Sequence, residues 1–173
     1  MKIFESPNVG HILVTNRTDA NGNNLYPNSA GGVAYVDVWG YSNHTYYQPA
    51  LVFYNHLGSS NAHNIADASS HELGHNLSLT HDGRTGESYY SGHGSGNTSW
   101  APIMGSGYYK NVTQWSNGNY TGANNFQEDV IEIANRLGYR TDDHGDDINS
   151  ATALSISAAG VVEVTDPETD PFN

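Results

Sequence analysis

Three short apolar runs in the first third of the chain predict β-strands. Residues 10–16, 33–39 and 50–54 are rich in β-branched and aromatic side chains, a composition that favours strands. The stretches between the first two runs, at 19–24 and 27–32, are dense in residues such as Asn, Gly and Pro that tolerate the backbone angles of turns. The pattern therefore predicts a small sheet with long connections.

A helical pattern follows these strands. Ile65, Ser69, Leu73 and Leu77 recur at intervals of four, so they share one face of a helix, and we expect that face to pack against the sheet. A second helix is predicted at 124–137, because Asn124 can cap its first turn and acidic residues near its start favour the helix dipole. Gly138 would end it, and its apolar face would consist of Phe126, Val130, Ile133 and Leu137.

The charge distribution separates the end of the chain from the rest. The net charge is −12, and residues 141–173 contain eight acidic residues and no Lys or Arg. We expect residues 141–150 to form an acidic linker and residues 151–173 to begin a C-terminal β-domain, after a first domain at 1–140. The acidic cluster at 142–147 matches no EF-hand spacing, so a solvated linker is the default interpretation and a Ca²⁺ site the alternative.

The composition also restricts the partners and the compartment. An acidic chain is a poor partner for nucleic acid, and no apolar run is long enough to span a membrane. With no cysteine, disulfides contribute nothing. We expect a monomeric, secreted protein of bacterial type, although residues 1–5 lack the apolar core of a signal peptide, so an export signal would have to lie upstream.

Three histidines and one glutamate carry the chemistry. On a helix, His71 and His75 project from the same face and can aim at one point about 2.0–2.1 Å from each ring, which is the zinc–nitrogen distance. Glu72 sits beside that point, and the chain must turn after about Leu77 for His81 to return as a third ligand. The alternative is an amphipathic helix with surface histidines.

Three protein ligands leave the fourth zinc position open, which distinguishes a catalytic zinc from a structural one. The cation would acidify a water molecule and polarise a carbonyl group, and Glu72 could accept the released proton and pass it to a leaving amine. The spacing thus predicts zinc-dependent hydrolysis of peptide bonds.

The extended pattern, with Asp82 directly after His81, resembles the metzincin metallopeptidases of the adamalysin or reprolysin branch. The resemblance implies that His71, His75 and His81 bind one catalytic Zn²⁺, that Glu72 is the general base and that Asp82 supports the site from beneath. The chain departs from the family at Ser78, where the family has glycine. A serine there would adopt left-handed backbone angles at a cost of about 1 kcal/mol or somewhat more.

A methionine turn is the second family feature. Met104 is the one methionine beyond the first residue, and Pro102 and Gly105 bracket it as in a tight turn. Some metzincins have a zinc-binding tyrosine two residues later, but Ser106 holds that place here. We hypothesise that Tyr108 or Tyr109 lines a specificity pocket, with simple packing as the alternative.

The resemblance implies an α/β (α+β) zincin-like fold. We expect a partial twisted mixed sheet packed on the active-site helix, and a lower lobe with the methionine turn and a C-terminal helix. The N-terminal part of the family's fold would be missing, and the tail resembles the start of a β-sandwich. An exposed edge strand would bind an extended substrate through its main chain, and the residues concerned are Gly32, Val33, Ala34 and Tyr35.

The sequence therefore predicts a zinc metalloendopeptidase that acts on proteins or peptides. Two alternatives are a zinc-binding but proteolytically silent module that captures peptides, and an adhesive extracellular module whose histidines bind metal incidentally. The intact Glu72 argues against the silent module.

Overall fold

The computed structural model describes residues 9–27, 29–42, 44–139, 147–149, 151, 155–156, 159–160 and 162–163. Its contacts separate two compact units, Met1–Gly138 and Tyr139–Asn173. All the predicted site residues lie in the first unit.

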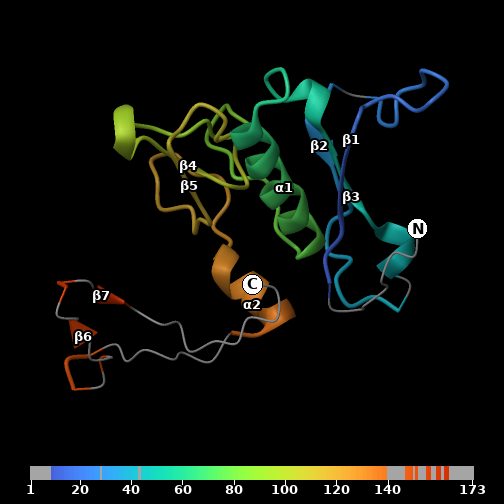
Figure 1. Ribbon diagram of the computed structural model, residues 1–173. Helices are drawn as coiled ribbons and strands as arrows, with labels where there is room; N and C mark the ends of the chain where they lie inside the picture. The colour runs from blue at the N-terminus through green and yellow to red at the C-terminus, as the bar shows by residue number, and fades with distance from the viewer. Residues whose placement is uncertain are drawn as a thin grey trace. The chain divides into compact units, whose positions relative to one another are not determined.

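A three-stranded mixed sheet forms one side of the first unit (Figure 1). Strand β3 (Ala50–Phe53) lies in the middle, parallel to β1 (Ile12–Thr15) and antiparallel to β2 (Gly32–Val33). Three of the four β3 residues are buried, which explains the apolar run at this position. Strand β2 pairs with β3 alone among the described strands, so it forms an edge of the sheet.

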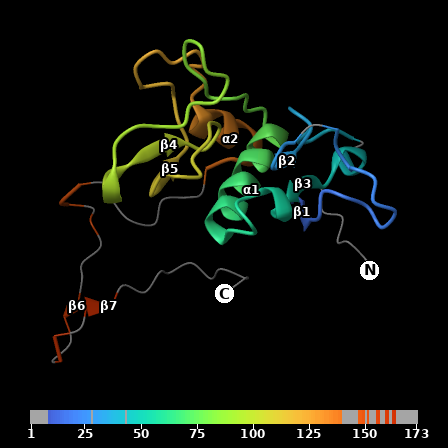
Figure 2. The same cartoon turned by 90° about the horizontal axis from the view of Figure 1, so that it is seen from above.

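Helix α1 (Ala62–Asn76) packs against this sheet, as Figures 1 and 2 both show. It begins after Asn61, whose side chain accepts a hydrogen bond from the Asn64 N–H. Ile65 and Ala68 pack against Val52 of the sheet and Leu57. The prediction that the apolar stripe of this helix faces the sheet is confirmed.

The predicted strand at 33–39 is wrong beyond Val33. The chain leaves the sheet there, and the N–H groups of Asp37, Val38 and Trp39 donate to the carbonyl groups of His75 and Asn76 over 2.9–3.2 Å. Asp37 adopts a left-handed φ of 58°. This segment therefore satisfies carbonyl groups that the last turn of a helix leaves without partners.

The same segment contacts the last helix of the unit. The Asp37 carboxylate forms an ion pair with Arg136, which lies in α2 (Asp129–Leu137). Asp37 thus links the end of α1 through its backbone and α2 through its side chain.

The lower lobe consists mainly of loops. It contains a parallel pair of short strands, β4 (Trp100–Pro102) and β5 (Val112–Gln114), together with α2. Short 3₁₀ helices complete the unit: η1 (His44–Tyr47), η2 (Tyr54–His56) and η3 (Gly96–Thr98). The expected combination of a small mixed sheet, an active-site helix and a lobe with a C-terminal helix is confirmed as a zincin-like α/β fold.

The predicted start of α2 is wrong by one turn. The helix begins at Asp129 rather than near Asn124, and Phe126 is 73% exposed outside it. Residues 124–127 are extended away from the helix because their side chains hydrogen-bond to the loop around His81, as described below. Gly138, at φ 79°, ends the helix as expected.

In the second unit, β6 (Ser155–Ile156) pairs antiparallel with β7 (Val162–Glu163). The acidic cluster at 142–147, for which a solvated linker was the default expectation and a Ca²⁺ site the alternative, lies outside the described residues except for Asp147. The assignment of 141–150 to a linker and of 151–173 to a β-domain stays a prediction.

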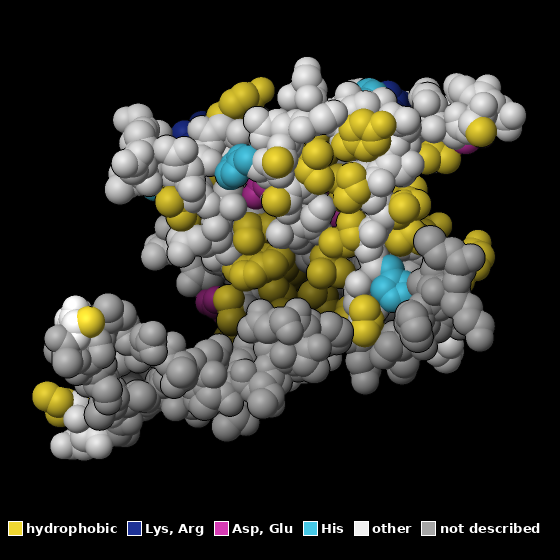
Figure 3. Space-filling view, viewed as in Figure 1, with side chains coloured by type: hydrophobic (Ala, Val, Ile, Leu, Met, Phe, Trp, Pro, Cys, Tyr) yellow, Lys and Arg dark blue, Asp and Glu magenta, His cyan; other side chains and the backbone are white. Residues whose placement is uncertain are grey.

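On the face that Figure 3 shows, few charged side chains are visible among the described residues. In Figure 3 hydrophobic side chains gather in the middle of the visible face, whereas Lys, Arg, Asp and Glu are sparse. None of the described helices combines the length and the hydropathy that a membrane span requires.

Candidate metal centre

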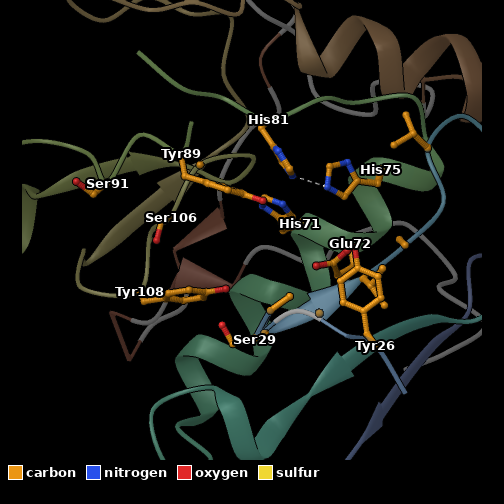
Figure 4. Close-up of a pocket in the computed structure, with 17 residues that line it drawn as sticks. Tyr26, Ser29, His71, Glu72, His75, His81, Tyr89, Ser91, Ser106 and Tyr108 are labelled. Atoms are coloured by element: carbon orange, nitrogen blue, oxygen red, sulfur yellow. Dashed lines mark hydrogen bonds between the residues drawn. The ribbon is translucent and has the colours of Figure 1, made fainter. Parts of the chain in front are cut away.

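The three predicted histidines converge. His71 and His75 project from α1, and His81 comes from the segment that follows it (Figure 4). The three candidate ligand atoms all lie within 4.8 Å of one another, and the Nε2 atoms of His75 and His81 are 3.0 Å apart. Among the described residues, no fourth His, Cys, Asp or Glu joins this group.

Hydrogen bonds on the outer side of two rings fix their orientation. The Nδ1 atom of His71 lies 2.8 Å from the Ile103 carbonyl oxygen, and Nδ1 of His75 lies 2.8 Å from the Leu79 carbonyl oxygen. A carbonyl oxygen can only accept, so each Nδ1 carries the proton and donates it. The Nε2 lone pairs are therefore left to face the common point, as in metal-binding histidines.

The donor set fits zinc. Two ligands of a tetrahedral zinc at 2.0–2.1 Å lie about 3.3 Å apart, which falls within the separations found here. Burial lowers the pKa of His71 to about 3 and that of His81 to about 4, and nearby histidines add to both effects. Burial also lowers the pKa of His75. All three rings are thus neutral near pH 7, which is the form that binds a metal.

A sharp reversal after α1 brings His81 back to the helix. Ser78 adopts a φ of 85°, its N–H donates to the His75 carbonyl oxygen, and the Leu79 N–H donates to that of Gly74. This is the left-handed ending that helices commonly adopt with glycine. Ser78 therefore adopts the left-handed backbone angle that was expected at this position, where the resembled family has glycine.

Polar side chains from 125–127 clamp the loop that leads to His81. The Gln127 side chain accepts from the Thr80 N–H at 2.8 Å and donates to the Ser78 carbonyl oxygen at 3.2 Å. Asn125 donates to the carbonyl oxygens of Thr80 and His81. The sequence pattern predicted a helix over these residues and did not indicate this role. Their amide side chains were the only local signal for it.

The methionine turn lies against the triad. The Gly105 N–H donates to the Pro102 carbonyl oxygen at 3.0 Å, which closes the turn, and Met104 is fully buried. The Asp82 N–H donates to the Met104 carbonyl oxygen at 2.8 Å. Gly74 leaves room for this turn, since a Cβ atom there would lie 2.6 Å from the Met104 sulfur. The turn thus contacts the elements that carry all three histidines.

Two buried carboxylates lie beneath the site. Asp82 is 1% exposed and Asp129 is fully buried. Burial, with a smaller contribution from the charge of Asp129, raises the pKa of Asp82 to about 7. Burial also raises the pKa of Asp129 to about 6, although the Ser116 N–H donates to this carboxylate at 2.9 Å.

A cavity of about 690 Å³ opens over the triad. Glu72 lines it beside the histidines, and burial raises the pKa of this carboxyl to about 8. The positive charge of a zinc ion held by the histidines would lower this pKa again, toward the ionised form that a base requires. The wall opposite the lower lobe is formed by residues 31–34, which include edge strand β2. Gly32 lets this wall approach Glu72, since a Cβ atom at Gly32 would lie 2.6 Å from the Glu72 Oε1.

Tyrosines form much of the remaining wall. Tyr26, Tyr89 and Tyr108 line the cavity, whereas Tyr109 is 93% exposed outside it. Tyr35 does not line it either, because its ring packs edge-on against Tyr47 at 5.0 Å. Tyr26 and Tyr89 were not predicted as site residues, because their neighbours in sequence carry no motif.

The first half of the chain matches a known family. Residues 5–82 match the family model described as Metallo-peptidase family M12B Reprolysin-like. The match covers slightly less than half of the 173 residues and includes the triad, Glu72 and Asp82. No curated protein and no solved structure matches the chain. The buried turn around Met104 lies outside the matched residues and is therefore an independent structural observation.

Replacing Ser78 with glycine should stabilise the protein. A left-handed angle costs an L-residue about 1–2 kcal/mol, and the added freedom of glycine in the unfolded chain offsets part of that gain. We expect Ser78→Gly to raise the free energy of unfolding by about 0.5–1 kcal/mol, measured by urea denaturation. The control, Ser70→Gly within α1, should lower it; a lower value for Ser78→Gly would contradict the strain argument.

Removing the charge of Asp129 should stabilise the protein at neutral pH. Its folded-state pKa of about 6 lies above the ordinary 3.8, so the protonated form stabilises the fold below about pH 4, and this contribution is lost as the pH rises through 6. The amide oxygen of an asparagine side chain at this position could still accept from the Ser116 N–H. We expect Asp129→Asn to gain about 1–2 kcal/mol at pH 7.5 and almost nothing at pH 4.

Chemical denaturation at both pH values checks this expectation. Glu132→Gln removes a charge from the same helix at a site that is not fully buried, so it should show no such gain. An Asp129→Asn variant less stable than the parent at pH 7.5 would show that the charged carboxylate has a stabilising partner.

Proposed function

This chain is a metzincin zinc metallopeptidase, and on that premise we propose that it hydrolyses internal peptide bonds with Glu72 as the proton-accepting base. The observation that carries the proposal is the convergence of three neutral imidazoles beside the carboxyl group of Glu72, which lies on the same helix as His71 and His75. His71, His75 and His81 would hold the ion. When bound there, zinc acidifies water and polarises the carbonyl group of a substrate.

We propose that Glu72 moves the proton. It follows His71 in sequence, and its side chain lines the same cavity (Figure 4). Glu72 takes a proton from the water whose oxygen bonds to the carbonyl carbon. It then delivers that proton to the amide nitrogen as the carbon–nitrogen bond breaks, so one carboxylate serves both halves of the reaction.

The edge strand supports an extended substrate. Residues 32–34 line the cavity next to Glu72, and β2 has no second neighbour among the described strands. An extended peptide that pairs with this edge would bind through its main chain, independently of its sequence. We assign Gly32, Val33 and Ala34 to this role through their backbone. The Tyr35 side chain is not assigned to substrate binding, because its ring packs against Tyr47 outside the cavity.

Asp82 and Met104 are proposed to support the metal site. Asp82 hydrogen-bonds through its backbone to Met104, whose sulfur lies under Gly74 of α1. We propose that these residues hold the histidines in place without touching substrate. The net charge of −12 and the low lysine content support an extracellular location, and we propose that the protein is a monomer.

A silent peptide-capture module is the second candidate, because the same edge strand and metal would bind peptides without cleaving them. Glu72 distinguishes the two, since a capture module has no use for a buried carboxylate at this point. Chelator-sensitive digestion of casein would support the peptidase, whereas zinc binding without cleavage would support capture.

Glu72→Ala should keep the metal and lose activity. None of the three ligands changes, so we expect one zinc per chain, as in the parent, and casein turnover at least about 100-fold lower because the base is lost. Zinc is measured by atomic absorption and turnover with labelled casein.

His81→Ala is the matched variant that should lose zinc as well as activity. Glu132→Ala, on α2, should change neither. If Glu72→Ala digested casein as fast as the parent, Glu72 would not be the base.

A further inference from the structure

One side chain beside the triad has no part in the mechanism above. The Tyr89 ring lies 4.2 Å from the His81 ring and 6.1 Å from the His71 ring, measured between centroids. In Figure 4 it points from its loop toward His71. Tyr89 also lines the cavity that contains Glu72.

The backbone holds Tyr89 in this position. The Tyr90 N–H donates to the Asp82 carbonyl oxygen at 2.7 Å, and the Ser106 N–H donates to the Tyr90 carbonyl oxygen at 3.0 Å. Tyr90 is 4% exposed and stacks on Tyr120 with centroids 4.4 Å apart. These bonds fix residue 90 beside residue 82, so Tyr89 is held close to the segment that carries His81.

The Tyr89 hydroxyl has no hydrogen-bond partner within the described part of the chain. The two neighbouring tyrosines differ, since the Tyr90 hydroxyl bonds to Nδ1 of His93 at 3.1 Å and the Tyr120 hydroxyl donates to the Gly83 carbonyl oxygen at 2.8 Å. A phenol has an ordinary pKa near 10 and so remains a donor at neutral pH. Its partner would then come from a molecule in the cavity.

The other two cavity tyrosines are less well placed for the reacting group. Tyr108 packs against the core formed by Val52, Leu57 and Ala68, and its hydroxyl lies near Gly31 of the opposite wall. Tyr26 has no ring contact with the triad among the described residues, and Figure 4 draws its ring below Glu72 and His81 above it. Only Tyr89 stacks on a ring of the triad.

We propose that Tyr89 is a further catalytic residue, whose hydroxyl donates a hydrogen bond to the substrate's carbonyl oxygen as negative charge develops on it. The inference rests on the proposed peptidase function. When the water oxygen bonds to the carbonyl carbon, the C=O electron pair moves onto the carbonyl oxygen and the water proton goes to Glu72. Tyr89 keeps its own proton and shares it through the hydrogen bond. A donor that meets charge formed only in the transition state raises the rate rather than the affinity.

Tyr89→Phe tests the hydroxyl alone, because the ring that packs on His81 remains. With a quenched peptide derived from a casein cleavage site, we expect kcat to fall about 10- to 100-fold and KM to change less than about twofold. Zinc content and the zinc concentration needed in a chelator competition should match the parent. The control is Tyr109→Phe, which removes the same atom at a fully exposed position and should behave as the parent.

Inhibitor binding provides a readout that does not depend on turnover. A phosphinic analogue of the same peptide carries a tetrahedral, negatively charged centre, whereas a thiol analogue lacks the second oxygen. We expect Tyr89→Phe to lower the affinity for the phosphinic analogue by the same factor as kcat and to leave the affinity for the thiol analogue unchanged. Both affinities are measured by calorimetry.

Three results would overturn the assignment. A kcat within twofold of the parent would leave the hydroxyl without a role in the reaction, a change confined to KM would make Tyr89 a substrate contact, and loss of zinc would make it a support of the triad. If the parent bound zinc but cleaved nothing, the peptidase function would fail instead. The phosphinic comparison would still decide whether the hydroxyl meets an oxyanion.

Discussion

The site depends on one constraint: a helix must end abruptly and the chain must return within six residues so that His81 faces His75. Two rings on one helix define a direction but no closed metal site, because both approach from the same side. The third ring closes the site, and it is delivered by a backbone reversal whose angle at Ser78 is unfavourable for its residue type. The neighbouring hydrogen bonds therefore have to hold a strained bend.

The surrounding structure supplies those bonds from three separate segments. Residues 37–39 satisfy the last carbonyl groups of α1, the amide side chains of Asn125 and Gln127 bind the returning loop, and the turn at Met104 contacts it from beneath. Each segment is irregular because it follows the shape of the bend rather than a repeating pattern. The lower lobe accordingly has little regular structure.

The parts of this arrangement that depend on local spacing could be predicted from the sequence. The four-residue interval of His71 and His75, the apolar stripe of α1 and the turn around Met104 each follow from neighbours in the chain. The end of β2 and the start of α2 could not be predicted. In residues 34–39 and 124–127, hydrogen bonds to segments more than 35 positions away override the local strand or helix propensity. Tyr89 was missed for a different reason: no motif surrounds it in the sequence, and its place near His81 depends on the backbone contact between residues 90 and 82.

Asp37 gives the cavity an anchored end. Its backbone binds the end of α1 beside the edge-strand wall, and its carboxylate binds Arg136 of α2 in the lower lobe. Spreading the two walls at this end would break a helix termination and an ion pair in the same motion.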